Sequence, residues 1–227
     1  MTRPLLLDLF CGAGGAAMGY HRAGFDVVGV DVRPQPHYPF RFVQGDALRP
    51  PVDFSGFAAI HASPPCQAYT QMSARWRGRG GIADSHPELL EPTRELLAKS
   101  GLPTIVENVA GAGRHMRTDF FLHGGMFGLG VHRPRRFEVN WPYWGAWPAP
   151  RVKEPIGVYG QRPDGRALRY RTNGNGGKKS VMRAAKSVEE AQRVMGIDWM
   201  PEWRELAEAI PPAYTEWIGR QLIEQLS

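Results

Sequence analysis

The sequence begins with a short apolar run that a glycine-rich turn stops. Residues 5–10 read Leu-Leu-Leu-Asp-Leu-Phe, and residues 11–15 follow as Cys-Gly-Ala-Gly-Gly. An apolar run of this length predicts a buried strand, and the glycines predict a tight turn that lets a ligand approach the backbone. Residues 16–23 then predict a helix, which Gly24 ends. This strand–turn–helix unit is typical of α/β proteins.

Further strands and helices alternate along the chain. Strands are predicted over residues 25–31, 40–46, 57–62 and 103–109, and helices over residues 87–100, 187–196 and 213–226. This alternation favours a parallel sheet with helices on both faces, and ligands bind beyond the carboxyl ends of such strands. The residues at the predicted strand ends are Phe10, Asp31, Asp46, Cys66 and Glu107. We therefore expect one ligand site at that edge of the sheet.

Charge is distributed unevenly along the 227 residues. The formal net charge is +6, and residues 114–186 carry fifteen Arg and Lys against four Asp and Glu. Such a segment indicates a surface that faces a polyanion, although an ordinary solvated basic face has the same composition. We expect residues 141–186 to form a small, irregular, basic insert in a main domain made of residues 1–140 and 187–227.

Several classes of protein are disfavoured. Two cysteines do not make a disulfide framework or a Cys-rich zinc site, and no metal site is predicted. No apolar run reaches the length of a membrane span, and the apolar start is too short for the core of a signal peptide. We expect a cytoplasmic protein with free thiols.

The glycine-rich turn has the features of a nucleoside site. The spacing Gly12-x-Gly14-Gly15 followed by Gly19 fits the dinucleotide fingerprint poorly. Phe10 offers an aromatic face to a purine, and Asp31 offers a carboxylate to a ribose diol. These residues favour a nucleoside without a pyrophosphate, such as S-adenosylmethionine. A turn with a purely structural role is the alternative.

Three further motifs carry groups suited to chemistry on a ring. Residues 64–67, Pro-Pro-Cys-Gln, hold in a stiff turn a thiol whose thiolate can add to an electron-poor carbon. Residues 107–109, Glu-Asn-Val, place a carboxyl group at a strand end, where a raised pKa makes it a proton donor. Arg133 and Arg135 share one face of an extended strand and can direct two guanidinium groups at one target. Each motif has a structural alternative: a buried structural cysteine for Cys66, a surface acid for Glu107, and a solvated basic strand for Arg133 and Arg135.

In this order, the motifs resemble those of the C5-cytosine DNA methyltransferase family. Residues 8–15 resemble its cofactor motif, residues 65–67 its nucleophile motif, residues 107–109 its third signature and residues 133–135 its Arg-x-Arg element. The resemblance covers residues 1–140 closely and residues 187–227 loosely. It implies a Rossmann-like, S-adenosylmethionine-dependent methyltransferase fold, with residues 141–186 as a reduced target-recognition insert and double-stranded DNA as the partner.

The resemblance also implies a role for each matched residue. Cys66 attacks C6 of a flipped-out cytosine, Glu107 acts at N3, Asn108 positions the segment of Pro65 and Cys66, and Arg133 and Arg135 hold the base near O2. The implied cofactor-binding residues are Phe10, Gly12, Gly14, Asp31, Asp46 and Pro65, with the ribose at Asp31 and the adenine amine at Asp46. The residue that fills the gap left by the base is expected at Gln71 or Ser73.

The chain departs from the family pattern near its end and in its size. His132 stands where the family usually has Gln, and residues 210–214 replace its Gly-Asn-Ser-Val. The small insert implies a short or loosely specified recognition sequence, and a monomeric bacterial or phage-encoded enzyme, with a partner subunit as a second source of specificity. An RNA methyltransferase of the same fold and a non-catalytic DNA-binding subunit are the alternatives. The Cys-Phe-Thr tripeptide of the tRNA-specific branch is absent from the sequence.

Overall fold

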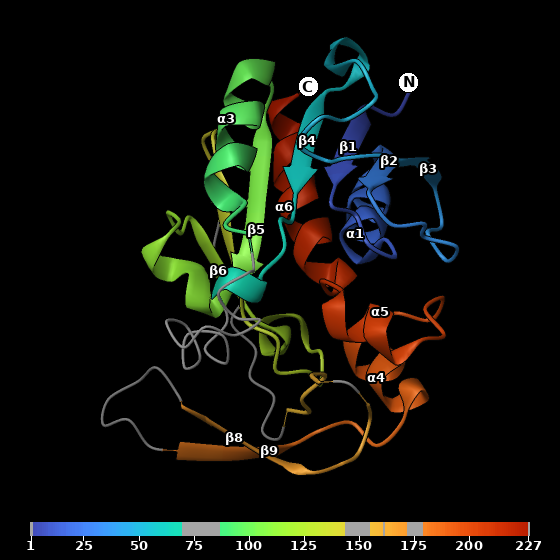
Figure 1. Ribbon diagram of the computed structural model, residues 1–227, viewed down its shortest axis with the longest axis vertical. Coiled ribbons are helices and arrows are strands. Elements are labelled where there is room, and N and C mark those ends of the chain that lie inside the picture. Colours follow the sequence, from blue (N-terminus) through green and yellow to red (C-terminus); the bar gives the residue numbers. More distant parts are fainter. Residues whose placement is uncertain (1, 70–86, 144–154, 161, 172–178, 227) are drawn as a thin grey trace.

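The computed structural model describes residues 2–69, 87–143, 155–160, 162–171 and 179–226, of which residues 168–171 and 179–181 are described by their backbone only. A seven-stranded sheet forms the centre of the molecule (Figure 1). Its strands are β1 (Leu5–Leu9), β2 (Asp26–Asp31), β3 (Arg41–Gln44), β4 (Ala59–Ala62), β5 (Thr104–Val109), β6 (Phe120–Leu122) and β7 (Arg135–Val139).

The strand order is β3-β2-β1-β4-β5-β7-β6. The first five strands in this order are parallel, whereas β7 runs antiparallel to both β5 and β6. The prediction of a parallel sheet is therefore wrong at this edge. A parallel strand needs a long crossover, usually a helix, and residues 123–134 between β6 and β7 contain only the short 3-10 helix η5 (Gly124–Phe127). The chain returns directly as an antiparallel strand.

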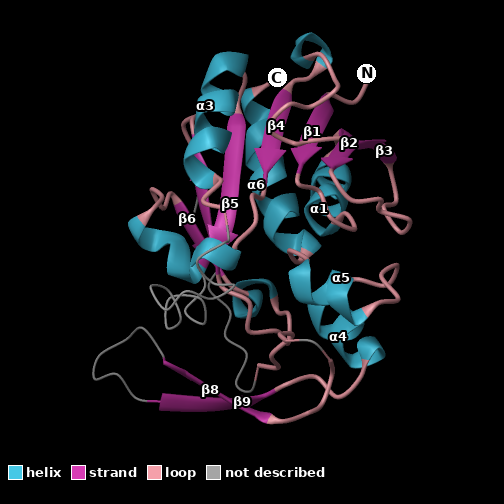
Figure 2. Ribbon diagram, viewed as in Figure 1, coloured by secondary structure: helices cyan, strands magenta, loops and turns pink. Residues whose placement is uncertain are grey.

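Helices cover both faces of the sheet, as predicted (Figure 2). α1 (Gly15–Ala23) and α6 (Pro212–Gln225) pack against each other on one face, and α3 (Leu90–Ser100) packs on the other. Successive residues of a strand point to opposite faces, so Leu6 packs with the α1 side and Leu7 with the α3 side. The main core is thus two apolar layers with the sheet between them.

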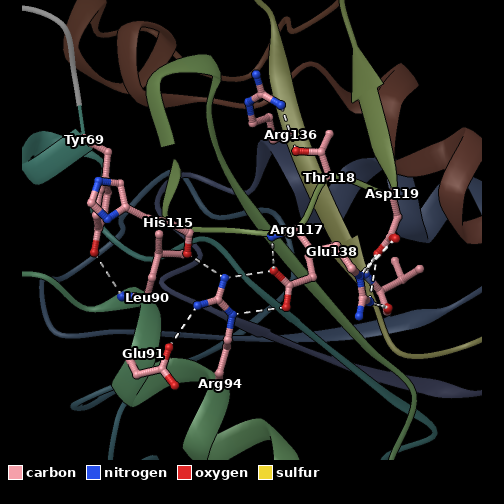
Figure 3. A network of polar contacts seen from close by, with 11 residues as sticks. Tyr69, Leu90, Glu91, Arg94, His115, Arg117, Thr118, Asp119, Arg136 and Glu138 are labelled. Atoms are coloured by element: carbon pink, nitrogen blue, oxygen red, sulfur yellow. Dashed lines mark hydrogen bonds and ion pairs between the residues drawn. The ribbon is translucent and has the colours of Figure 1, made fainter. Parts of the chain in front are cut away.

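A polar network joins α3 to the antiparallel edge of the sheet (Figure 3). The Arg94 guanidinium donates to both carboxylate oxygens of Glu138 at 3.1 and 2.9 Å, and to the backbone oxygen of His115 at 2.8 Å. The 3-10 helix η2 (Gln67–Tyr69) joins the same region, because the Leu90 amide donates to the Tyr69 hydroxyl at 3.3 Å. These contacts fix the start of α3 beside the carboxyl end of β5.

A two-stranded antiparallel unit, β8 (Ala167–Arg171) and β9 (Lys179–Arg183), stands apart from the main sheet at the bottom of Figure 1. The segment around Val158 packs in a third apolar cluster with α4 (Val188–Met195) and α5 (Trp203–Glu208). Within the described ranges, no helix is long and apolar enough to cross a membrane. The same ranges contain no group of three or more His, Cys, Asp or Glu that could hold a metal ion.

Candidate active site

The turn after β1, which we call the glycine loop (residues 10–15), has an unusual backbone. Phe10, Gly12 and Gly14 have positive φ angles of 59°, 49° and 85°. An aromatic residue rarely adopts this conformation, so the half-buried Phe10 stores strain of the kind that accompanies ligand sites. A Cβ at Gly14 would lie 2.8 Å from Pro39, whereas a Cβ at Gly12 would meet no atom within 4 Å. Gly14 is needed for packing, and Gly12 leaves its backbone open to a ligand.

Asp31 at the end of β2 is bound to this loop. Its carboxylate accepts the amide of Gly12 at 3.1 Å and the amide of Arg33 at 3.0 Å, and the residue is 7% exposed. Asp46 is exposed, and its Oδ1 accepts the amide of Leu48 at 2.9 Å. The open backbone at Gly12 beside an oriented carboxylate fits the nucleoside of S-adenosylmethionine.

A second group of side chains, the cysteine cluster (Cys66, Glu107, Asn108 and Arg135), lies where β4 and β5 end and β7 begins. Asn108 is fully buried, and its Nδ2 donates to the backbone oxygen of Pro64 at 3.0 Å. Its Oδ1 accepts the amide of Val109 at 2.9 Å. Asn108 thus ties the turn that carries Cys66 to β5, which is the kind of contact expected of it.

Charged and titratable groups surround the Cys66 thiol. Burial raises the pKa of Cys66, and the nearby Arg135 opposes this effect. Burial also raises the pKa of Glu107, while Arg135, Arg133 and a hydrogen bond from Ser63 lower it. Arg135 Nε lies 2.8 Å from Glu107 Oε1, although Oε1 accepts no well-directed hydrogen bond from any described residue. The cluster therefore holds a thiol and a carboxyl group that share one guanidinium.

Arg133 differs from Arg135. It is 1% exposed, and its guanidinium donates to the backbone oxygens of Ala209 (2.8 Å), Val158 (2.8 Å) and Ala207 (2.6 Å). Burial, with a smaller effect of Arg135, lowers the pKa of Arg133 to about 10, so it stays charged at neutral pH. The two arginines do not share partners, because Arg133 precedes the first residue of β7 and strand alternation does not apply to it.

Sequence reasoning missed three residues next to this cluster. The Tyr20 hydroxyl lies 3.0 Å from His61 Nδ1, and His61 Nε2 lies 2.7 Å from Ser63 Oγ. Ser63 in turn hydrogen-bonds Glu107. The available signal was the i, i+2 spacing of a histidine and a serine just before the Pro-Pro-Cys turn, which puts both on one face of an extended segment.

Two predicted residues lie outside the described parts of the chain. They are the two candidates for filling the gap left by the base, Gln71 and Ser73. Pro65 is half-buried beside Cys66. The roles of all these residues remain predictions.

Comparison with known proteins gives one curated relative by sequence. The type II methyltransferase M.XorII of Xanthomonas oryzae pv. oryzae is 30% identical over an alignment that covers 51% of this chain. The chain spans only 31% of the length of that relative. No protein-family model matches the chain.

Solved structures resemble the whole chain. A putative DNA modification methyltransferase encoded within a prophage (E. coli) has a TM-score of 0.65 at 15% identity, covering 98% of this chain and 99% of its own. The S. pombe Dnmt2 methyltransferase has a TM-score of 0.63 at 14% identity over 99% of both chains. The Entamoeba histolytica methyltransferase EhMeth has a TM-score of 0.63 at 11% identity over 100% of both chains.

These comparisons confirm the predicted fold class. The chain has the α/β fold of S-adenosylmethionine-dependent methyltransferases. The proteins that it resembles are each named as methyltransferases.

Proposed function

We propose that this protein transfers a methyl group from S-adenosylmethionine to C5 of cytosine in double-stranded DNA. The observation that carries the proposal is the cysteine cluster, in which a thiol, a buried carboxyl group and a guanidinium lie at one edge of the sheet. This set suits addition of a nucleophile to a ring that must be protonated at the same time. A DNA modification methyltransferase among the structural neighbours agrees with it.

In the proposed reaction, the Cys66 thiol gives its proton to solvent water, and the resulting thiolate forms a bond from Sγ to C6 of the base. Glu107 gives its proton to N3, and the electron pair of the C5=C6 bond becomes available at C5. S-adenosylmethionine, when bound, supplies the methyl group as a sulfonium electrophile. Methyl transfer releases S-adenosylhomocysteine. Solvent water then takes the proton from C5, the C5=C6 bond re-forms and Cys66 leaves as thiolate. N3 then returns its proton to Glu107.

The remaining residues of the cluster orient these groups. Arg135 holds the Glu107 carboxyl and presents its guanidinium toward the O2 side of the base. Asn108 fixes the turn of Pro65 and Cys66 through the Pro64 carbonyl. Arg133 serves the site indirectly, because its three carbonyl partners tie Val158 to the last turn of α5 and to Ala209, which follows that helix.

The glycine loop is the proposed cofactor site. Phe10 stacks on the adenine, Asp31 binds the ribose and Asp46 binds the adenine amine, while Gly12 and Gly14 let the nucleoside approach the backbone. Pro65 borders the same space. Each contact matches a group that the structure leaves accessible or already orients.

The basic region 141–186 is the proposed DNA-recognition region. The β8–β9 unit stands clear of the main sheet, so it can reach a groove of duplex DNA (Figure 1). The target atoms lie inside the base stack, so the cytosine must be flipped out at a cost of about a few kcal/mol. We propose that the protein does this as a monomer.

The test measures methyl transfer from tritiated S-adenosylmethionine to duplex DNA and to tRNA. DNA should be labelled and tRNA should not. DNA containing 5-fluorocytosine should form a covalent adduct. Fluorine replaces the C5 proton, whose loss is needed to release Cys66. Cys66→Ser should abolish turnover and the adduct while leaving the melting temperature unchanged, and Cys11→Ala, which removes the other thiol, should keep the adduct.

Three outcomes would contradict the proposal. Labelling of tRNA alone would assign the chain to RNA, and DNA binding without label would assign it to a non-catalytic subunit. An adduct formed by Cys66→Ser would exclude Cys66 as the nucleophile. Bisulfite mapping of the product DNA then gives the recognition sequence.

A further inference from the structure

A line of hydrogen bonds leads from α1, across β4, to the carboxyl group of Glu107. It runs from Tyr20 through His61 and Ser63, with distances of 3.0 Å and 2.7 Å for the first two bonds. Tyr20 and His61 are fully buried. None of these three residues belongs to the motifs that carry the family resemblance.

The imidazole of His61 decides how the protons in this line are arranged. Burial lowers the pKa of His61 to about 3, so the ring is neutral at neutral pH and carries a single N–H. One ring nitrogen must donate and the other must accept. Because each nitrogen faces an oxygen, all the hydrogen bonds in the line run in the same direction.

The hydrogen bonds can run in two directions, and only one of them leaves the Glu107 proton available for N3 of the cytosine. In that direction, Tyr20 donates to Nδ1, Nε2–H donates to Ser63, and the Ser63 hydroxyl donates to Glu107. In the reverse direction, Glu107 would give its own proton to Ser63. In the reverse direction the Tyr20 hydroxyl proton would also have no acceptor, because His61 is the only hydrogen-bond partner of that hydroxyl within the described part of the chain.

Other charged and titratable groups also face Glu107 and His61. Arg133 and Arg135 face Glu107 from the β7 side, Cys66 faces it from the turn after β4, and Tyr214 faces it from α6. On β1, Asp8 is the register partner of His61 and is fully buried. Burial, reinforced by Asp31, raises the pKa of Asp8 well above its usual range.

We propose that Tyr20, His61 and Ser63 are positioning residues that act as one directed chain, which holds the Ser63 hydroxyl as a permanent donor to Glu107. The chain fixes the orientation of the carboxyl group and stabilises the carboxylate that remains when the proton is on the base. The effect of the chain on the rate of methyl transfer rests on the proposed function, whereas its effect on the pKa of Glu107 does not.

The test follows the Glu107 carboxyl directly in the DNA-free protein. Carbon-13 labelling of glutamate side chains gives one carboxyl resonance per residue, and the Glu107 resonance is the one missing from Glu107→Gln. In Ser63→Ala the midpoint of the Glu107 titration should move to higher pH by about one unit, because a donor to the carboxylate is lost. Tyr20→Phe should move it in the same direction by a smaller amount.

Tyr38→Phe is the matched control for Tyr20→Phe. Tyr38 is a buried tyrosine in the same apolar cluster as Tyr20, and its hydroxyl has no hydrogen-bond partner among the described residues. It should leave the Glu107 titration unchanged. Because Tyr20→Phe keeps the ring and its packing, it remains informative even if Ser63→Ala perturbs the turn before Cys66.

Each outcome is decisive. Shifts in both Ser63→Ala and Tyr20→Phe, with none in Tyr38→Phe, support the chain. A shift in Ser63→Ala alone would reduce it to a single hydrogen bond, and equal shifts in both tyrosine variants would make it a general effect of packing; either result overturns the proposal. If the shifts appear but wild-type protein methylates no DNA, the proposed function fails and the chain stands.

A kinetic measurement connects the chain to catalysis. In a single turnover with saturating DNA and S-adenosylmethionine, Ser63→Ala should slow methyl transfer about tenfold with little change in KM, because one hydrogen bond to a charged group is lost. Ser63→Thr keeps the hydroxyl and should restore most of the rate. A loss that Ser63→Thr does not restore would point to packing instead of the donor.

Discussion

The glycine loop and the cysteine cluster lie at the same edge of one sheet, yet they are built from different parts of the chain. The glycine loop is a run of six consecutive residues whose shape depends on positive φ angles. The cysteine cluster takes side chains from β5, β7 and the turn after β4, and its supports reach into α1 and the segment after α5. The first is a local backbone device, and the second exists only in the folded molecule.

This difference separates binding from chemistry. Changes in the glycine loop should act on the affinity for the cofactor, and changes in the cysteine cluster should act on the rate of the chemical step or on the stability of the fold. The expected effects of five variants test this separation.

Glu107→Gln should produce the largest effect. An amide cannot deliver a proton to N3, and general acid catalysis contributes about 10²- to 10⁴-fold to a rate. Single-turnover methyl transfer should therefore fall at least a hundredfold. Calorimetry with S-adenosylhomocysteine should give an affinity within about twofold of wild type; a parallel loss of cofactor affinity would show that the two regions are not separate.

Arg133→Met should mainly lower stability, whereas Arg135→Met should mainly slow methyl transfer. Loss of Arg133 leaves one buried and two partly buried carbonyls without this donor, so we expect a loss of about 3 kcal/mol in the free energy of unfolding in urea. Loss of Arg135 should cost about 1 kcal/mol and slow methyl transfer more than Arg133→Met does. Equal losses of stability would contradict the different roles assigned to them.

His61 should make stability depend on pH. Because burial lowers the pKa of His61 to about 3, the folded protein binds fewer protons than the unfolded chain between about pH 6.5 and pH 3. The stabilising effect is complete above about pH 6.5 and is lost as the pH falls. Urea unfolding should show wild type losing about 1.4 kcal/mol more per pH unit than His61→Gln in this window. Identical slopes would mean that the imidazole is not buried in solution.

Asp31→Asn should produce the smallest effect. The amide keeps the shape of the side chain but weakens the hydrogen bonds to a ribose, so the Kd for S-adenosylhomocysteine should rise about fivefold. Affinity for duplex DNA, measured by fluorescence anisotropy, should not change. A change in DNA affinity alone would move the cofactor site away from the glycine loop.

The sequence predicted the elements that carry the site more accurately than their arrangement at the β6–β7 edge. Each strand before residue 110 was found within two residues of its predicted ends, because a buried parallel strand is a continuous apolar run between turn residues. The antiparallel pairing of β7 was missed because its alternating residues do not reveal on which side of β5 the strand pairs, or in which direction.

The candidate site likewise has features that local sequence predicts and features that depend on tertiary contacts. The positive φ angles at Gly12 and Gly14 follow from local sequence, because glycine adopts that conformation without a side-chain clash. The pairing of Arg135 with Glu107, the burial of Arg133 against carbonyls 74 and 76 residues away, and the line from Tyr20 to Glu107 come from contacts distant in sequence. Sequence by itself determined which reactive groups the chain carries and which turns present them. Tertiary structure decided which of those groups meet, because desolvation and hydrogen-bond partners depend on residues that only folding brings together.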